Sequence, residues 1–169
     1  KISSLETPVN MLAVCNMKEQ EIVGDKILLL DGIQDPGNLG TIIRSAVAFN
    51  IDTIVLGDNT VDCYNPKVIR ASQGMIFHIN IIQNNLLEVI PLIKTKGIKV
   101  YGTKVTYGND VKGLNIKDKY ALVMGNEGNG VSDEVLDLCD EYIYIDMNPV
   151  CESLNVAIAT SIILYELNK

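Results

Sequence analysis

A single carboxylate stands among glycines in the segment ALVMGNEGNGVS, residues 121–132. Gly125, Gly128 and Gly130 can take positive φ and let the backbone come close to a ligand. A carboxylate that follows a buried strand is a common ligand contact in open α/β sheets. Glu127 is therefore a candidate site residue; a structural turn with a solvated Glu127 is the alternative.

A second glycine-rich segment, DGIQDPGNLGTIIR at residues 31–44, joins an apolar run to a helix-period segment. It matches neither the dinucleotide fingerprint nor the phosphate-binding P-loop, and glycines there also suit a simple strand-to-helix turn. Its informative residue is Arg44, at the border of the apolar helix face, where a guanidinium can lie over a cleft. A salt-bridged surface arginine fits the same position.

The third candidate segment, IDMNPVCESLN at residues 145–155, leads into an apolar run at the end of the chain. Ser153 and Asn155 are the polar side chains at the start of the helix expected there. They are interpreted either as helix caps or as ligand contacts.

These segments lie between apolar runs and helix-period segments that alternate in a β-α-β pattern. Several of the runs are apolar enough to be covered on both faces, which predicts a mainly parallel central sheet in an α/β fold. Strands are expected at residues 26–31, 53–56, 78–82, 99–102, 120–124 and 141–145. Helices are expected at residues 38–49, 66–72, 86–96, 132–139 and 153–167, and a long loop at 103–117.

Two of these helices carry further expectations. Asn38 follows Pro36 and Gly37 and is expected to cap the helix at residues 38–49. The last helix has almost no polar face, so it must be buried in the domain or against a second subunit.

Composition limits the classes of function. The chain has 169 residues, 47% of them apolar, and a formal net charge of −7. This size suits one domain with a real core, and the charge argues against a broad basic surface that binds nucleic acid by counterion release. No apolar run approaches the roughly 18 to 20 residues that cross a bilayer, and no signal-peptide pattern opens the chain. We expect a cytoplasmic protein outside the membrane.

The cysteines give no sign of a metal site. Cys15, Cys63, Cys139 and Cys151 lie far apart, and His78 is the only histidine. This spacing suggests neither a zinc site nor a disulfide framework, so we expect reduced thiols and no metal.

Taken together, DPGNLGTIIRSA, VMGNEGNGVSDE and ESLNVAIATSIILYEL resemble, in this order, the three motifs of the SpoU family of RNA methyltransferases, which is TrmH-like and part of the SPOUT superfamily. The resemblance spans roughly Leu28 to Leu167. Residues 5–14, LETPVNMLAV, resemble the lead-in to this domain in members with an N-terminal RNA-binding domain. We therefore expect residues 1–24 to be a lead-in or linker from such a domain, absent from this sequence, and residues 25–169 to be the methyltransferase domain.

The resemblance implies a fold, a cofactor and an assembly. It implies an α/β sheet domain whose C-terminal segment forms a deep trefoil knot, which general fold rules would not predict. It also implies a homodimer and S-adenosylmethionine as the methyl donor. The donor-binding positions that the resemblance implies are Thr103, Gly125, Ile145, Met147, Ser153, Leu154 and Asn155.

The resemblance further implies catalytic roles for Asn38, Arg44, Glu127, Ser153 and Asn155. The reaction is in-line attack of a ribose 2′-hydroxyl on a sulfonium methyl, which needs alignment and removal of a poorly acidic proton. In the family scheme Arg44 removes this proton, with help from an RNA phosphate. The scheme also allows Arg44 to come from the other subunit of the dimer. Because guanidinium rarely loses its proton, we favour Arg44 as a phosphate or oxyanion clamp and keep the base role as the alternative.

The third motif departs from the family pattern. Asp146 stands where the family has Pro, and Pro149 stands where it has Gly, so the loop is expected to be stiffer. Ser153 and Asn155 are intact, so an active enzyme is expected.

The expected function is methylation of a ribose 2′-hydroxyl in structured RNA, with ribosomal RNA favoured. A transfer RNA methyltransferase and an RNA-binding homologue without catalysis are the alternatives. A dinucleotide-binding oxidoreductase lacks its glycine fingerprint.

Overall fold

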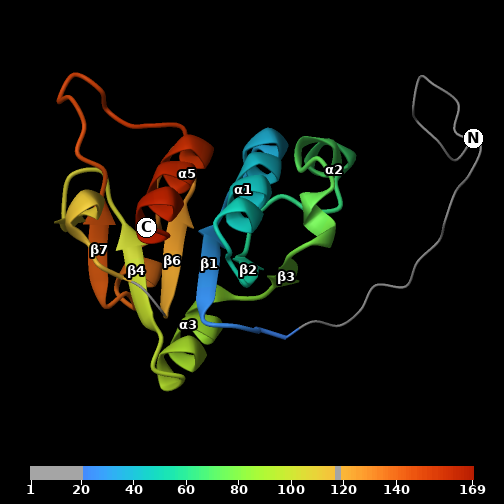
Figure 1. The fold of residues 1–169 in the computed structure, drawn as a ribbon, viewed down its shortest axis with the longest axis horizontal. Coiled ribbons are helices and arrows are strands. Elements are labelled where there is room, and N and C mark those ends of the chain that lie inside the picture. The colour runs from blue at the N-terminus through green and yellow to red at the C-terminus, as the bar shows by residue number, and fades with distance from the viewer. Residues whose placement is uncertain (1–20, 117–118) are drawn as a thin grey trace, which may run out of the picture.

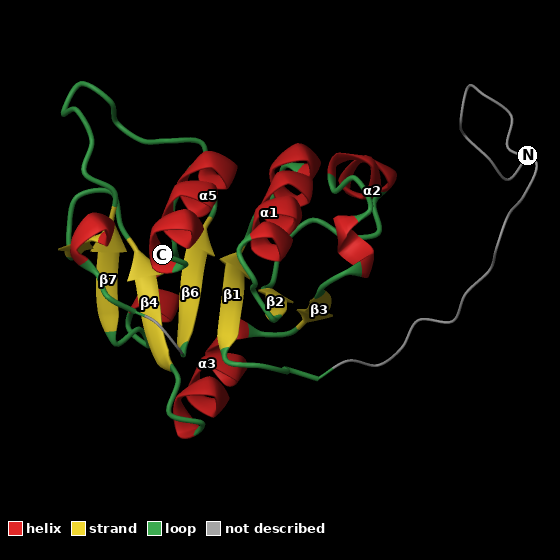
Figure 2. Cartoon of the chain, viewed as in Figure 1, coloured by secondary structure: helices red, strands yellow, loops and turns green. Residues whose placement is uncertain are grey.

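The computed structural model describes residues 21–116 and 119–169, in which seven strands form one sheet. The strand order is β3-β2-β1-β6-β4-β7-β5, and every pairing between neighbours is parallel (Figure 2). The predicted mainly parallel α/β fold is therefore confirmed. The strands are β1 Lys26–Asp31, β2 Thr53–Leu56, β3 Asn80–Gln83, β4 Lys99–Thr103, β5 Asn109–Asp110, β6 Tyr120–Gly125 and β7 Glu141–Tyr144.

Helices cover both faces of this sheet (Figure 1). Those on one face are α1 Pro36–Ala48, α2 Pro66–Ala71 and α5 Val156–Leu167, with the 3-10 helices η1 Met75–Phe77 and η2 Val111–Gly113. Those on the other face are α3 Leu86–Thr95 and α4 Asp133–Leu136. The molecule is thus a three-layer sandwich with two apolar cores.

The two central strands explain both cores. In β1, Leu28 and Leu30 pack toward α1 and α5, whereas Ile27 and Leu29 pack toward α3. Side chains alternate along a strand, so a strand covered on both faces needs a continuous apolar run. From β1 the chain continues outward to β2 and β3, then returns to the far side of β1 and builds the other strands. The carboxyl ends of β1 and β6 therefore border the topological switch point, where ligands bind in open α/β sheets.

Several predicted boundaries were wrong. Asn38 does not cap α1, because the Asp35 carboxylate accepts the hydrogen bond from the Asn38 N–H (2.8 Å) and Pro36 opens the helix. His78 lies at the end of η1 rather than in a strand, and β3 begins two residues later. The helix expected at 132–139 is only α4, and the helix expected from 153 begins at Val156.

The segment expected to be a long loop contains β5 and η2, which the sequence pattern did not predict. The strand β5 has two residues, Asn109 and Asp110, and pairs with β7 at the edge of the sheet. Both of its residues are polar, so it carries none of the apolar alternation that marks a strand in the sequence. The expected lead-in at 1–24 lies outside the described residues up to position 20.

The last helix is only partly covered. Six residues of α5 are buried, whereas Ile158 and Tyr165 are 53% and 54% exposed. Burial within the domain thus accounts for one side of this helix. No helix in the described ranges is long and apolar enough to span a membrane.

Candidate active site

A cavity of about 550 Å³ lies at the carboxyl ends of β4, β6 and β7, beside the first turns of α5. Its volume falls within the roughly 300 to 1,000 Å³ that is typical of small-molecule sites. The predicted site residues that line it are Thr103, Gly125, Glu127, Ile145, Met147, Ser153 and Leu154. The cavity therefore collects side chains and backbone from the second and third motifs and from the end of β4.

Glu127 connects the second motif to the first. Its Oε1 accepts hydrogen bonds from Asn38 Nδ2 (3.0 Å) and the Asp35 N–H (3.2 Å), and its Oε2 accepts one from the Gln34 N–H (3.3 Å). The same carboxylate thus binds the turn that precedes α1 and the first turn of that helix.

Asn155 connects the third motif to the same group. Its Nδ2 donates to Asn38 Oδ1 (3.0 Å), and its Oδ1 accepts from the N–H groups of Ala157 (3.0 Å) and Ile158 (3.3 Å). The predicted helix cap and the predicted site residue are therefore one side chain. The chain Asn155–Asn38–Glu127, which we call the polar bridge, joins all three motifs.

The polar bridge keeps Glu127 ionised. Partial burial raises the pKa of Glu127, but the hydrogen bonds from Asn38 and from the backbone N–H groups of Glu127, Asp35 and Gln34 outweigh it. The net pKa of Glu127 is below its ordinary value. At neutral pH the group is a carboxylate with both oxygens engaged, which suits it to orient Asn38 rather than to exchange a proton.

Two residues that sequence reasoning missed hold the loops in place. Asp31 Oδ2 accepts hydrogen bonds from the N–H and the Oγ of Ser132 (2.8 Å each). Asn126 Nδ2 donates to the Gly32 carbonyl (2.8 Å), and its Oδ1 accepts from the Gly128 N–H (2.9 Å). The signal was their position, because each lies at the carboxyl end of a central strand or directly after it.

The glycines of the second motif play different parts. Only Gly130 has a positive φ (74°), so the expectation of positive φ was wrong for Gly125 and Gly128. Gly125 serves close packing instead: a Cβ there would lie 2.1 Å from the Gly130 carbonyl carbon and 2.1 Å from the Val131 nitrogen. The loop therefore folds back directly over the end of β6.

The cavity also offers polar groups that are free to bind a ligand. Met147 and Leu154 line it, and their backbone N–H groups hydrogen-bond no described residue. The Ser153 hydroxyl is exposed and likewise has no described partner, whereas the Thr103 hydroxyl donates to the Val123 carbonyl (2.9 Å). Free backbone donors between apolar side chains such as Ile145 fit an adenosyl group. The residues present therefore suit S-adenosylmethionine, the donor that the family resemblance implied.

Arg44 lies apart from this group. It is exposed, its guanidinium forms no hydrogen bond or ion pair with any described residue, and it does not line the cavity. It lies six positions after Asn38, which is about 9 Å along the helix axis. Within one chain the structure does not bring Arg44 to the polar bridge.

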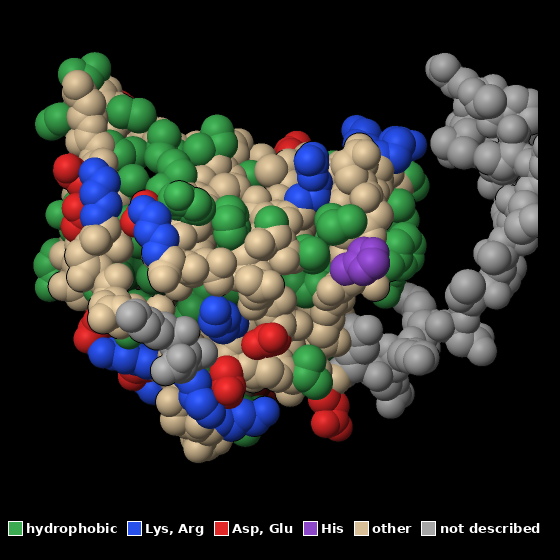
Figure 3. All heavy atoms as spheres, in the orientation of Figure 1, with side chains coloured by type: hydrophobic (Ala, Val, Ile, Leu, Met, Phe, Trp, Pro, Cys, Tyr) green, Lys and Arg blue, Asp and Glu red, His purple; other side chains and the backbone are tan. Residues whose placement is uncertain are grey.

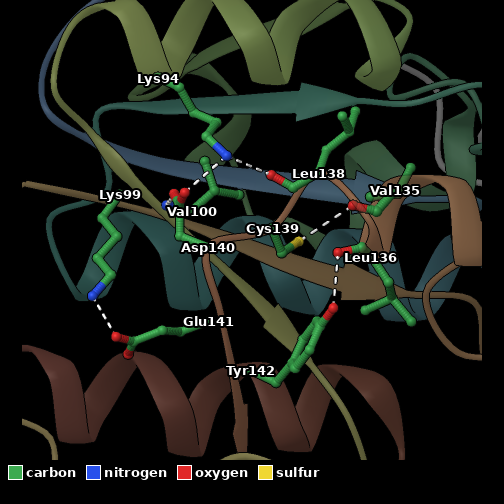
Figure 4. A network of polar contacts seen from close by, with 10 residues as sticks. All are labelled: Lys94, Lys99, Val100, Val135, Leu136, Leu138, Cys139, Asp140, Glu141 and Tyr142. Carbon is green, nitrogen blue, oxygen red and sulfur yellow. Dashed lines mark hydrogen bonds and ion pairs between the residues drawn. The ribbon is translucent and has the colours of Figure 1, made fainter.

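A separate polar network lies at the amino ends of β4 and β7 (Figure 4). Asp140 binds Lys94 (2.8 Å) and the Val100 N–H (2.8 Å), and Lys99 pairs with Glu141. Cys139 lies beside it, and burial raises the pKa of its thiol to about 11. These groups bind one another and lie at the opposite ends of the strands from the cavity, so they are structural. Among the residues that the structure describes, no cluster of His, Cys, Asp or Glu could hold a metal ion.

Known proteins resemble this chain over most of its length. The model of the SpoU rRNA Methylase family matches residues 25–165. The chain is 42% identical over 167 residues to the 23S rRNA (guanosine(2553)-2′-O)-methyltransferase RlmP of Bacillus subtilis. That match covers 98% of this chain and 67% of the relative.

Solved structures agree. The SpoU methyltransferase AviRb of Streptomyces viridochromogenes, in complex with AdoMet, is 31% identical with a TM-score of 0.80, over 87% of this chain and 61% of that one. An AdoMet-bound rRNA methyltransferase of Sinorhizobium meliloti is 35% identical with a TM-score of 0.80, over 85% of this chain and 56% of that one. The chain thus spans between about half and two thirds of these proteins.

Proposed function

Because the chain belongs to the SpoU rRNA Methylase family, we propose that it transfers a methyl group from S-adenosylmethionine to a ribose 2′-hydroxyl of RNA. The observation that carries the proposal is the polar bridge, which joins three motifs at the rim of a cavity of about 550 Å³. AdoMet in two related crystal structures supports the same donor here.

In this proposal the cavity holds the donor, and the residues around it fix its orientation. S-adenosylmethionine supplies the electrophilic sulfonium methyl group. The free N–H groups of Met147 and Leu154 bind its polar edge, Ile145 and Gly125 enclose it, and Ser153 contributes its hydroxyl. Thr103 shapes one wall through its bond to β6.

The polar bridge orients the ribose side of the site. Ionised Glu127 fixes the Asn38 amide, and Asn38 in turn fixes Asn155 at the start of α5. In this proposal the hydroxyl proton passes to solvent and S-adenosylhomocysteine is released. None of these three residues accepts that proton, because the two amides are not basic and the lowered pKa of Glu127 makes its carboxylate a weak base. Alignment of the attacking oxygen is their contribution.

Arg44 is the proposed clamp for the substrate phosphate or the developing oxyanion. An exposed guanidinium without a described partner is available for this task, and its planar donors match a phosphate. Its separation from the polar bridge favours action on the cavity of a second subunit. The base role for Arg44 would require it to lose a proton in a solvated position, which is unfavourable.

A homodimer and a C-terminal trefoil knot belong to the same proposal. Ile158, Ile162 and Tyr165 follow i, i+4, i+7 spacing on α5, and the first and last of them are more than half exposed. Such an apolar stripe supports a contact with a second copy of the chain. The knot rests on the family resemblance alone.

Ribosomal RNA is the proposed substrate class, because the Bacillus relative is named for 23S rRNA, and the cytoplasm is the proposed place of action. Residues 25–169 form the proposed catalytic domain. Transfer RNA is the second candidate.

Calorimetric titration of the chain with S-adenosylmethionine tests the proposal. We expect one donor per chain and no binding of NAD. Absence of heat at millimolar donor would leave only a binding role for this chain.

A further inference from the structure

The chain has only two arginines and one histidine, and all three lie on one surface. Arg44 is on α1, Arg70 is on α2, and His78 ends η1. We call this surface the arginine face and define it by Arg44, Tyr64, Lys67, Arg70, Phe77 and His78. All six of these residues are exposed.

The packing of α1 against α2 brings the two arginines to the same side. A Cβ on Gly40 would lie 2.4 Å from the Ala71 Cβ, so the two helices touch at these residues. Arg44 follows Gly40 by four positions and lies one turn further along the side of α1 that contacts α2. Arg70 is next to the contacting residue Ala71 on α2, so both arginines border this helix contact. Figure 3 shows Lys and Arg side chains over α1 and α2, with hydrophobic side chains and the histidine beside them.

The cations of this face have no counterions among the described residues. Lys94, Lys99, Lys119 and Lys169 each pair with a carboxylate, but Arg44, Lys67 and Arg70 do not. From residue 59 to residue 87 the sequence holds one carboxylate, Asp62. In a chain with net charge −7, this local excess of positive charge favours an anionic partner.

The same segment of the chain carries two exposed aromatic residues, Tyr64 just before α2 and Phe77 in η1. Phe77 is 78% exposed and Tyr64 is 50% exposed. Neither ring pairs with another ring or with a cation in the described part of the chain. Aromatic faces next to unpaired cations are the combination that binds single-stranded nucleic acid, with bases on the rings and phosphates on the cations.

We propose that the arginine face binds a single-stranded RNA segment that flanks the nucleotide to be methylated. Phe77 stacks on a base, and Arg70 and Lys67 bind its phosphates. A duplex fits less well, since its bases are already stacked on one another and cannot cover the ring. This inference rests on the proposed function, because Arg44, which belongs to the arginine face, is the proposed clamp for the substrate.

Fluorescence anisotropy with two labelled RNAs tests the proposal: an oligouridylate of about 12 nucleotides, within the range of known single-strand sites, and a duplex of equal length. Phe77→Ala should weaken oligouridylate binding by at least about five-fold and leave the salt dependence unchanged. Arg70→Ala should reduce the slope of log K against log salt by about 0.7, the value for one phosphate contact on a single strand. Arg70→Lys should restore that slope.

Matched controls lie on the other face of the sheet. Leu92→Ala removes an apolar side chain that is 59% exposed on α3, and Lys96→Ala removes an unpaired cation at its end. Both should bind oligouridylate as the wild type does.

Three results would overturn the inference. The first is no oligouridylate binding by the wild type at about 50 mM salt, and the second is wild-type affinity for oligouridylate in both the Phe77→Ala and the Arg70→Ala variant. The third is a variant that loses RNA binding and at the same time loses its dimer in sedimentation. The last result would make the face a contact between copies. Titration with S-adenosylmethionine separates the two proposals. If the chain binds S-adenosylmethionine but the variants bind oligouridylate as the wild type does, only the proposal for the arginine face is wrong. If the chain does not bind S-adenosylmethionine, the proposed function is wrong.

Discussion

The position of Glu127 requires a carboxylate, because its side chain must accept hydrogen bonds on both oxygens. Its two oxygens accept three hydrogen bonds from the segment that starts α1. The residue pattern made Glu127 and Asn155 candidate site residues, and the family resemblance added Asn38, which the pattern had marked only as a helix cap. Neither predicted their bonds to one another, since Asn38 and Asn155 are 117 positions apart.

Glu127→Gln should disturb the polar bridge. An amide has one acceptor oxygen, so its NH₂ group would face an N–H donor of Gln34 or of Asp35. We expect the free energy of unfolding in urea to fall by about 1 kcal/mol, a typical loss for one hydrogen bond. Glu134→Gln, at an exposed position of α4 without a described hydrogen bond, should change it little.

The pH dependence of this effect follows from the lowered pKa of Glu127. A carboxyl group with a lower pKa in the folded state stabilises the fold fully above its unfolded pKa, about 4.3 for Glu. That contribution is lost as the pH falls through the folded-state pKa. The difference between wild type and Glu127→Gln should therefore be constant from neutral pH to about pH 5 and shrink below it. A difference that shrinks on going from pH 7 to pH 5 would contradict the pKa direction.

Arg44→Ala should slow methyl transfer strongly and leave the Kd for S-adenosylmethionine unchanged, because Arg44 does not line the cavity. Loss of one group that stabilises developing charge lowers kcat by roughly 10² to 10³. Single-turnover transfer of a labelled methyl group to RNA from cells that lack the gene measures it. Arg44→Lys should be intermediate, because it keeps the charge but loses the planar fork. A wild-type rate in Arg44→Ala would show that the assignment is wrong.

At the scale of elements, buried strands were the most predictable part of the fold. The runs at 26–31 and 53–56 became β1 and β2 without change, because burial on both faces demands continuous apolar sequence. Boundaries were less predictable where caps decide them. Asp35 rather than Asn38 caps α1. The Asn38 side chain instead donates to Glu127, a contact that the local sequence does not indicate.

Gly125→Ala tests how the second motif folds over β6. The added methyl group would lie 2.1 Å from backbone atoms of Gly130 and Val131, so the loop would have to shift away from β6. We expect the free energy of unfolding to fall by about 2 kcal/mol or more, in the range of overpacked cores, and donor affinity to fall with it. Gly113→Ala is the control, because its Cβ would meet nothing within 4 Å. Equal effects of the two substitutions would contradict the close packing.

At the scale of the whole molecule, the position of Arg44 has a consequence. The family resemblance implied catalytic roles for both Arg44 and Asn38, but one chain keeps them apart, which periodicity could not reveal. If Arg44 serves the cavity of a second subunit, two inactive variants can complement each other.

A one-to-one mixture of Arg44→Ala and Asn38→Ala chains, exchanged between dimers, tests this. Half of the dimers are then mixed, and each mixed dimer has one intact site, so about a quarter of the wild-type activity should return. Each variant alone gives the baseline. No recovery in a mixture shown by mass spectrometry to contain mixed dimers would place Arg44 in its own chain's site.

The central claim is that this chain methylates ribose 2′-hydroxyls in RNA. Mapping of 2′-O-methylated nucleotides in total RNA from cells with and without the gene tests it most directly. We expect one such nucleotide in ribosomal RNA to be lost with the gene and restored by the wild-type gene but not by Arg44→Ala. Identical maps in the two cell types, or loss of a methyl group on a base instead of a ribose, would contradict the claim.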